Sequence, residues 1–188
     1  LNETLETIGD RAFQGCSKLE DIIIPSTVQT IRNHVFADCS NLKSIVIPAG
    51  VETIDKNAFH NCTNLTDITI SEGVKNIIEL AFEHCSLETL TIPTSIEFID
   101  EGSFNWNKLK EVVIPAGVKS IGSYAFGFNP LTKLTFEDPT GWYKTLNTTD
   151  WEAKTGGEAV DLSNPATNAA KFVTSSDNGY VEYYFYKK

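Results

Sequence analysis

Four cysteines are the residues whose spacing most clearly suggests chemistry. They recur at a constant step of 23 residues, as Cys16, Cys39, Cys62 and Cys85. In an extracellular chain, an even number of cysteines would suggest disulfides. Later in the chain, however, the same position holds Asn107 and Asn129, and asparagine cannot form a disulfide. Cysteine and asparagine can both be buried while they hydrogen bond to an adjacent backbone turn, so we expect four free, inert, stacked thiols.

Histidines and carboxylates give weaker signals of chemistry. The three histidines, His34, His60 and His84, occupy different positions of the spacing, and the nearby cysteines should face inward, so a zinc site is not supported. Asp55 and Asp100 share one position, roughly 10 Å apart by strand spacing, but a glycosidase pair would need a cleft around them. Phosphate-loop, nucleophile-elbow and HExxH motifs are absent. We therefore predict no catalytic residue, no metal, no cofactor and no enzyme activity.

The elements that position these residues come from an internal repeat. Its period is 23 residues in the first half and 22 in the second, and the phenylalanines mark it: Phe13, Phe36, Phe59, Phe82, Phe104 and Phe126. A leucine follows each one, and then two apolar residues two positions apart, as in Ile45 and Ile47. Valine and isoleucine columns complete the repeat. The period shortens by one loop residue while every apolar column is kept, which favours a common core.

Each repeat has the pattern of a solenoid turn. The stretch from Leu19 to Ile24 ends in the alternation of a strand, and Pro25 ends it because proline cannot donate to a β-ladder. A second extended piece is expected from Val28 to Ile31. Asp10, Asn33 and Ser123 are suited to cap a short helix or turn that carries the phenylalanine. One turn alone cannot bury enough apolar surface to offset the entropy of ordering it, so successive turns must stack.

The motif LKSIVIPAGVETIDKNAFHNC, residues 42–62, shows the pattern most cleanly. It resembles the BspA-like class of leucine-rich repeat. The resemblance implies a right-handed superhelix of parallel short β-strands with short helical turns, of the α/β horseshoe type. It covers residues 1–137, about six turns, and starts in mid-repeat, so either further repeats precede Leu1 or this half-turn begins the ordered part. It also implies a bacterial secreted or cell-surface protein, with an extracellular role in binding or adhesion.

The repeat stops after Phe136, and residues 138–188 form an aromatic tail. Ser163, Asn164 and Pro165 precede a segment suited to a short helix. The stretch from Tyr180 to Tyr186 is typical of a strand, with Val181, Tyr183 and Phe185 on one face. Because a solenoid end exposes its core and an open sheet edge, we expect the tail to be a small β-rich cap on the sixth turn.

Charge and hydropathy exclude two classes of partner. The formal net charge is −10 and no cluster of lysine and arginine is present, so nucleic acid is not an expected partner. No apolar run approaches the roughly 20 residues of a membrane-spanning helix. The expected partner is a host or bacterial surface protein, and the expected location is the cell surface or the extracellular space.

The outward strand positions form the candidate partner-binding face. It comprises two columns: Asp21, Ser44, Asp67, Thr89 and Glu111 in one, and Ile23, Val46, Thr69, Thr91 and Val113 in the other. β-Branched residues are also expected on a plain solvated sheet. The face lacks the aromatic and arginine anchors of strong interfaces, so the affinity per site should be low, with avidity from many turns or copies.

An aromatic patch is the alternative, with a glycan as partner. The position two residues after each repeat phenylalanine becomes aromatic only beside the tail, at Trp106 and Phe128. Together with Trp142 and Trp151 of the tail, these side chains could form a stacking platform for a sugar. We predict that Trp106 and Phe128 contact tail residues, and full exposure of both would instead favour the binding patch.

Overall fold

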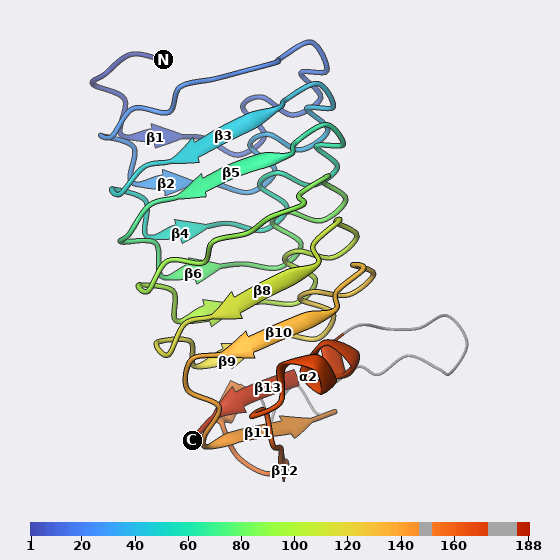
Figure 1. Ribbon diagram of the computed structural model, residues 1–188. Helices are drawn as coiled ribbons and strands as arrows, with labels where there is room; N and C mark the ends of the chain where they lie inside the picture. Colours follow the sequence, from blue (N-terminus) through green and yellow to red (C-terminus); the bar gives the residue numbers. More distant parts are fainter. Residues whose placement is uncertain (147–151, 173–183) are drawn as a thin grey trace.

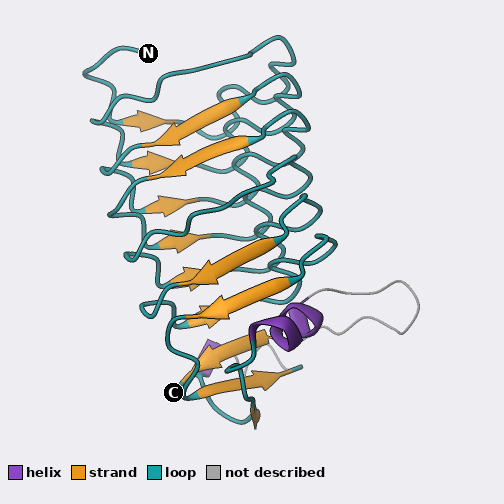
Figure 2. Cartoon of the chain, viewed as in Figure 1, coloured by secondary structure: helices purple, strands orange, loops and turns teal. Residues whose placement is uncertain are grey.

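The computed structural model describes residues 1–146, 152–172 and 184–188. The chain forms a β-solenoid in which successive repeats lie on top of one another (Figure 1). Each repeat passes through two extended positions, one at the front and one at the back of the stack, joined by turns (Figure 2). As a result, every column of the sequence repeat becomes a column of side chains along the stack.

The narrow strand position is formed in all six repeats. Its strands are β1 (Thr7–Ile8), β2 (Thr30–Ile31), β4 (Thr53–Ile54), β6 (Asn76–Ile77), β7 (Phe98–Ile99) and β9 (Ser120–Ile121). They pair in parallel, and each isoleucine lies opposite the isoleucine of the next repeat. The predicted second extended piece is thus confirmed, although the strands are two residues long. We call this surface the narrow sheet.

The broad strand position is less regular. Four repeats form a four-residue strand there: β3 (Ser44–Ile47), β5 (Asp67–Ile70), β8 (Glu111–Ile114) and β10 (Lys133–Phe136). They pair in parallel as β3 with β5 and β8 with β10. Within residues 1–146, the first and fourth repeats have no strand at this position, contrary to the expected strand in every turn. The fourth repeat is the first of three that lack one loop residue before the leucine, but the fifth and sixth still form the strand, so the shorter loop alone does not explain the interrupted ladder.

The phenylalanine-bearing segments are consecutive tight turns rather than the predicted short helical turns. In the second repeat, Ala37 N–H donates to the His34 carbonyl while Phe36 N–H donates to the next repeat, at Ala58. His34 and Asp38 have φ angles of 56° and 62°. A right-handed helix requires negative φ throughout, so these left-handed residues end each turn before a helix can form.

The polar residues expected as helix caps have correspondingly no helix to cap. Asp10, Asn33 and Ser123 all lie at the entrance to these tight turns. The Ser123 hydroxyl is buried and has no hydrogen-bond partner in the part of the chain that the structure describes. These residues have no helix to cap because each tight turn directs alternate N–H groups to the next repeat.

The core consists of ladders of identical side chains. The repeat phenylalanines stack ring on ring, with centroid separations between 5.0 and 5.6 Å. All of them except Phe13 are fully buried, and so are the isoleucines of the narrow sheet beyond β1. Offset stacking of parallel rings is favourable, and each ladder extends the core of one repeat into the next.

Residues of the tail pack on the sixth repeat. β13 (Tyr184–Lys187) pairs antiparallel with β9, β11 (Trp142–Thr145) pairs with β13, and β12 (Glu158–Ala159) pairs with β11. The narrow sheet therefore continues for three more strands and its β9 edge is covered. The predicted strand is present from Tyr184 onward, while Val181 and Tyr183 lie outside the described residues.

The predicted short helix is confirmed as α2 (Pro165–Phe172). The side chain of Asn164 caps it, since its Oδ1 accepts the N–H of Ala166. α2 lies over β10, where buried Asn168 donates to the Leu134 carbonyl at 3.1 Å and Phe172 contacts the Phe136 ring. The helix thereby satisfies a backbone carbonyl of β10, the last strand of the broad strand position.

Two expectations about large-scale architecture stay predictions. One is the superhelical handedness and horseshoe curvature. The other is a domain division after residue 137. The narrow sheet runs without interruption from the repeats into the tail, so the sheet itself marks no boundary there. None of the helices in the described ranges is both long and apolar enough to cross a membrane.

Candidate interaction surface

The broad face carries the predicted partner-binding residues, all of them exposed. We define it as the outward side of the broad strand position: Asp21, Ile23, Ser44, Val46, Asp67, Thr69, Thr89, Thr91, Glu111 and Val113. Strand pairing places Val46 beside Thr69, and Ser44 beside Asp67, on neighbouring repeats. Inward residues such as Ile45 and Ile47 are buried, so the alternation of the strand decides which column faces solvent.

One column of this face holds three exposed aliphatic side chains, with Thr69 and Thr91 between the second and the third, and we call it the aliphatic column. Ile23 is 82% exposed, Val46 is 57% exposed and Val113 is 49% exposed. A polar and charged column lies beside it, in which Lys133 and Glu111 form an ion pair at 3.4 Å. In the flanking column, Lys43 donates to Glu20 at 2.6 Å, and this hydrogen bond lowers the pKa of Glu20. Both pairs are exposed and contribute little to stability.

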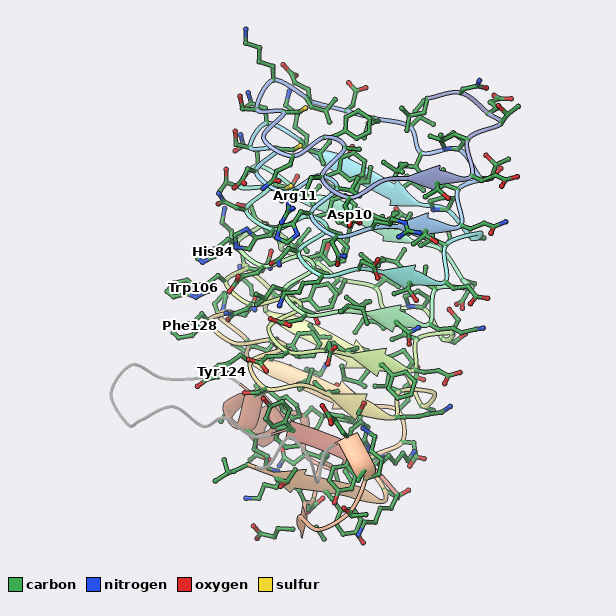
Figure 3. The ribbon with its side chains drawn as sticks, turned by 180° about the vertical axis from the view of Figure 1, so that it is seen from behind. Asp10, Arg11, His84, Trp106, Tyr124 and Phe128 are labelled. Carbon is green, nitrogen blue, oxygen red and sulfur yellow. The ribbon has the colours of Figure 1, made fainter. Side chains whose placement is uncertain are left out.

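The aromatic column lies elsewhere, on the tight turns (Figure 3). His84, Trp106 and Phe128 stack in sequence: His84 to Trp106 at 5.3 Å, and Trp106 to Phe128 at 4.3 Å with ring planes 2° apart. Trp106 is 47% exposed and Phe128 is half-buried. Within the described ranges, the ring contacts of Trp106 are with His84 and Phe128 rather than with the tail.

Trp142 of the tail does not extend this aromatic column. Trp142 is buried, packs edge-on against Phe136 and donates its indole N–H to the Asp138 carbonyl at 3.0 Å. It is therefore a core residue, and its assignment to an exposed aromatic patch was wrong, because β11 places it on the inner side of the tail strands. Trp151 lies outside the described residues.

The cysteine and asparagine column performs one structural task. Cys62 Sγ donates to the Phe36 carbonyl at 3.1 Å, and Asn129 Nδ2 donates to the Phe104 carbonyl at 2.8 Å. Each side chain thus satisfies a carbonyl of the preceding repeat, as expected from the interchange of the two residue types. The cysteines are free. Burial raises the pKa of Cys39 to about 11, and burial raises the pKa of Cys62 still further.

Cys16 departs from the expectation of four inert thiols. It is exposed, whereas the other three cysteines are buried. The buried thiols are poor nucleophiles because the thiolate is the reactive form and burial disfavours it. The difference arises from stacking, since the later cysteines lie between two repeats.

The other candidate reactive groups do not converge. Across residues 1–146, 152–172 and 184–188, no group of three histidine, cysteine or acidic side chains could hold a metal ion. Burial raises the pKa of both Asp55 and Asp100. Asp55 borders a 720 Å³ groove on the narrow sheet that Asp100 does not line. The two carboxylates therefore do not form an acid–base pair across one groove.

A second groove was not anticipated from the sequence. It has a volume of 360 Å³ and lies among the tight turns of the last three repeats, lined by Leu80, Glu83, Glu101, Gly102, Asn105, Tyr124 and Phe128. No single column of the sequence indicated it, because its lining combines different columns from three repeats.

The stacked repeats, the phenylalanine ladder and the parallel strands define a leucine-rich-repeat β-solenoid. The model of the BspA type leucine rich repeat region matches residues 1–108 and 29–142, in six copies. The chain belongs to this family. No curated protein matches the chain significantly.

Several solved bacterial structures are similar. The pneumococcal vaccine antigen PcpA is 23% identical with a TM-score of 0.55, and the match covers 72% of this chain and 44% of PcpA. A leucine rich cell surface protein from Faecalibacterium prausnitzii A2-165 is 28% identical with a TM-score of 0.49, covering 73% of this chain and 31% of that protein. The T. pallidum leucine rich repeat protein is 26% identical with a TM-score of 0.49, covering 59% and 57%.

The chain spans less than two thirds of each of these proteins. PcpA supports the fold alone at this level of identity.

Proposed function

We propose that the chain is a non-catalytic interaction module of a bacterial secreted or cell-surface protein, and that it adheres to a surface protein through the broad face. The exposed aliphatic column carries this proposal. Aliphatic side chains as exposed as Ile23 and Val46, in the same outward column of adjacent repeats, are costly to leave in water and are typical of interaction sites. Membership of a repeat family built for extended surfaces supports the same role.

The physical character of the face indicates how it would bind. Without aromatic or arginine anchors, each repeat offers only a modest contact. Neighbouring repeats present β-branched side chains in one column and polar side chains in the other at regular spacing. A repetitive partner or several copies of the protein could therefore engage together. Binding should then be weak for one molecule and strong for a multivalent display.

Substitution of the aliphatic column tests the proposal. The protein is immobilised on beads, and bead binding is measured on cultured host cells and on an array of host matrix and surface proteins. The triple variant Ile23→Lys, Val46→Lys, Val113→Lys should reduce bead binding at least about tenfold, because it places hydrated charges where the partner must be desolvated.

A matched control carries three lysines away from the broad face, at the exposed positions Thr7, Gln14 and Gln29. It changes the net charge by the same amount and should bind like the unsubstituted protein. Equal binding by both triple variants, with unchanged thermal melting, would show that the broad face is not the binding surface.

A glycan ligand at Trp106 is the second candidate, supported by the 47% exposure of that indole. Its stacking between His84 and Phe128 covers the ring faces, however, and sugars bind best to an open face. A glycan array probed with the protein and with Trp106→Asn would decide this candidate, which requires binding that the variant loses.

A further inference from the structure

The polar column of the broad face carries opposite charges at its two ends. From the first repeat to the sixth, this column comprises Asp21, Ser44, Asp67, Thr89, Glu111 and Lys133. Asp21 is exposed and takes part in none of the ion pairs among the described residues. Lys133 pairs with Glu111, yet 52% of its side chain stays exposed. Each end of the column therefore offers a charge that a partner of opposite sign can neutralise.

The aliphatic column beside it is nearly symmetric about its middle. Val46 belongs to β3 in the second repeat, and Val113 belongs to β8 in the fifth. These two strands lie on the same side of the stack (Figure 1). Thr69 and Thr91 occupy the two repeats between them. Reversing the order of the repeats thus exchanges valine with valine and threonine with threonine, which is what a two-fold axis does to two copies of one chain.

A second copy can be placed on the broad face by half a turn about an axis parallel to the strands. The axis passes between the third and fourth repeats, so the first repeat faces the sixth and the second faces the fifth. Each column then faces the same column of the second copy in reverse order. Val46 meets Val113 of the second copy, and Asp21 meets Lys133 of the second copy. Both contacts occur twice, because such an interface is isologous.

Other placements bring like charges or unmatched groups together. A shift of the second copy by one repeat sets Asp21 opposite Glu111, and a shift in the other direction sets Asp67 opposite Glu111. Half a turn about the solenoid axis instead sets the polar column against the aliphatic column, where desolvated carboxylates find no donor. Charge complementarity therefore selects the placement in which Asp21 meets Lys133.

We propose that the broad face binds a second copy of this chain in that placement, and that the protein thereby joins cells that display it. The inference rests on the proposed function, since it names the surface protein that the broad face binds. Lys43 and Lys110 meet at the rim of the contact. Their repulsion is small there, because Glu20 holds Lys43 through a 2.6 Å hydrogen bond and solvent screens exposed charges.

The size of the contact indicates its strength. Six repeats at about 4.8 Å extend about 24 Å, and a strand of about four residues extends about 13 Å, which gives a footprint of roughly 300 Å² per copy. Stable complexes bury about 800 Å² per partner. One pair of molecules should therefore associate weakly, and many copies on two facing surfaces should hold together by avidity.

Clustering of beads coated with the chain tests this partner. Parent beads should cluster with one another. Beads that carry Asp21→Lys should cluster at least about tenfold less, and so should beads that carry Lys133→Asp, because each change sets like charges together at both symmetric contacts. A mixture of the two variant beads should cluster like the parent, since every contact between unlike beads again joins a lysine to an aspartate.

The matched controls make the same changes of charge on the narrow sheet. Glu6→Lys and Lys75→Glu lie at exposed positions there, and beads with either variant should cluster like the parent. Clustering that is unaffected by Asp21→Lys, or that fails to return in the mixture, would overturn the placement. Parent beads that bind cultured host cells but never cluster would overturn this inference and leave the proposed function standing. Parent beads that do neither would contradict both.

Discussion

At the scale of single residues, the residue type at one repeat position decides which hydrogen bonds its side chain makes to the neighbouring repeats. Cys62 and Asn129 both cap a phenylalanine carbonyl of the preceding repeat. His60 and Glu83 occupy the same column and pair with each other because the column places them in adjacent repeats. Stacking of the repeats also decides which cysteine thiols are accessible to reagents.

Thiol accessibility follows from this arrangement. Iodoacetamide should label only Cys16 in the folded protein, because burial raises the pKa of Cys39, Cys62 and Cys85 and hides their sulfur atoms. Four labelled thiols are expected after denaturation without reductant. Mass spectrometry counts the adducts, and labelling of a second cysteine in the native state would contradict the burial.

Stability should depend on pH through His60. Its hydrogen bond with Glu83 raises the pKa of His60 above the ordinary value of 6.5. Although burial raises the pKa of Glu83, the hydrogen bonds from His60 and Asn105 outweigh it and lower that pKa below 4.5. The raised histidine pKa means that the ion pair stabilises the fold below about pH 6.5 and loses this effect as the pH rises through the folded pKa.

His60→Gln should therefore cost more at pH 5.5 than at pH 8.5, with a difference on the order of 1 kcal/mol. Urea unfolding at the two pH values measures it. Subtracting the variant from the parent protein removes the part of the opposite His34 contribution that comes from burial, which is the largest cause of its lowered pKa; the smaller part that comes from the charge of His60 changes with the variant. A cost that is the same at both pH values would show that the pair is not ionic in the folded state.

At the scale of elements, the ladders are the unit of stability. Phe82 is fully buried between Phe59 and Phe104, and both neighbouring rings stack on it at 5.0 and 5.4 Å. Its removal leaves a cavity that two repeats cannot fill. The tight turns that hold these rings depend on left-handed residues, so they tolerate glycine, asparagine or aspartate better than β-branched residues.

Phe82→Ala should destabilise the protein by about 3–5 kcal/mol. Phe98→Ala is the matched comparison, because Phe98 is a partly exposed residue of the neighbouring β7 and should cost clearly less. Equilibrium unfolding in urea gives both values. Similar costs for the two variants would argue against a continuous phenylalanine ladder.

At the scale of the whole molecule, the tail packs on the strand edge and the apolar core of the last repeat. β13 occupies the edge of β9, and α2 occupies the end of the broad strand position. An unpaired parallel edge presents N–H and C=O groups that invite pairing with another chain. The described tail residues supply partners for part of this edge, in addition to burying Phe136.

Removal of residues 184–188 should promote self-association. The shortened chain exposes the β9 edge, so light scattering after size-exclusion chromatography should show dimers or larger species that increase with concentration. Deletion of Lys188 alone is the control, since it leaves the β9–β13 pairing intact. A shortened chain that stays monomeric and melts unchanged would show that β13 does not protect the edge.

Much of this architecture could be predicted from the sequence because stacked repeats give every column one environment. The phenylalanine ladder, the narrow-sheet isoleucines and the equivalence of cysteine and asparagine follow from side-chain chemistry within one repeat. The helix at Pro165 follows from the local capping pattern in the tail. The parallel register also follows, since a shift by one residue would turn the isoleucines outward.

Other features required the tertiary structure, because they depend on the approach of separate segments. Backbone hydrogen bonds between repeats favour left-handed tight turns over the expected helix. The burial of Trp142 depends on how β11 meets Phe136. The groove depends on the approach of three repeats, since its lining comes from the tight turns of the fourth, fifth and sixth repeats. The repeat pattern of the sequence shows which residue types recur, but the packing of neighbouring repeats and of the tail decides what each residue contacts.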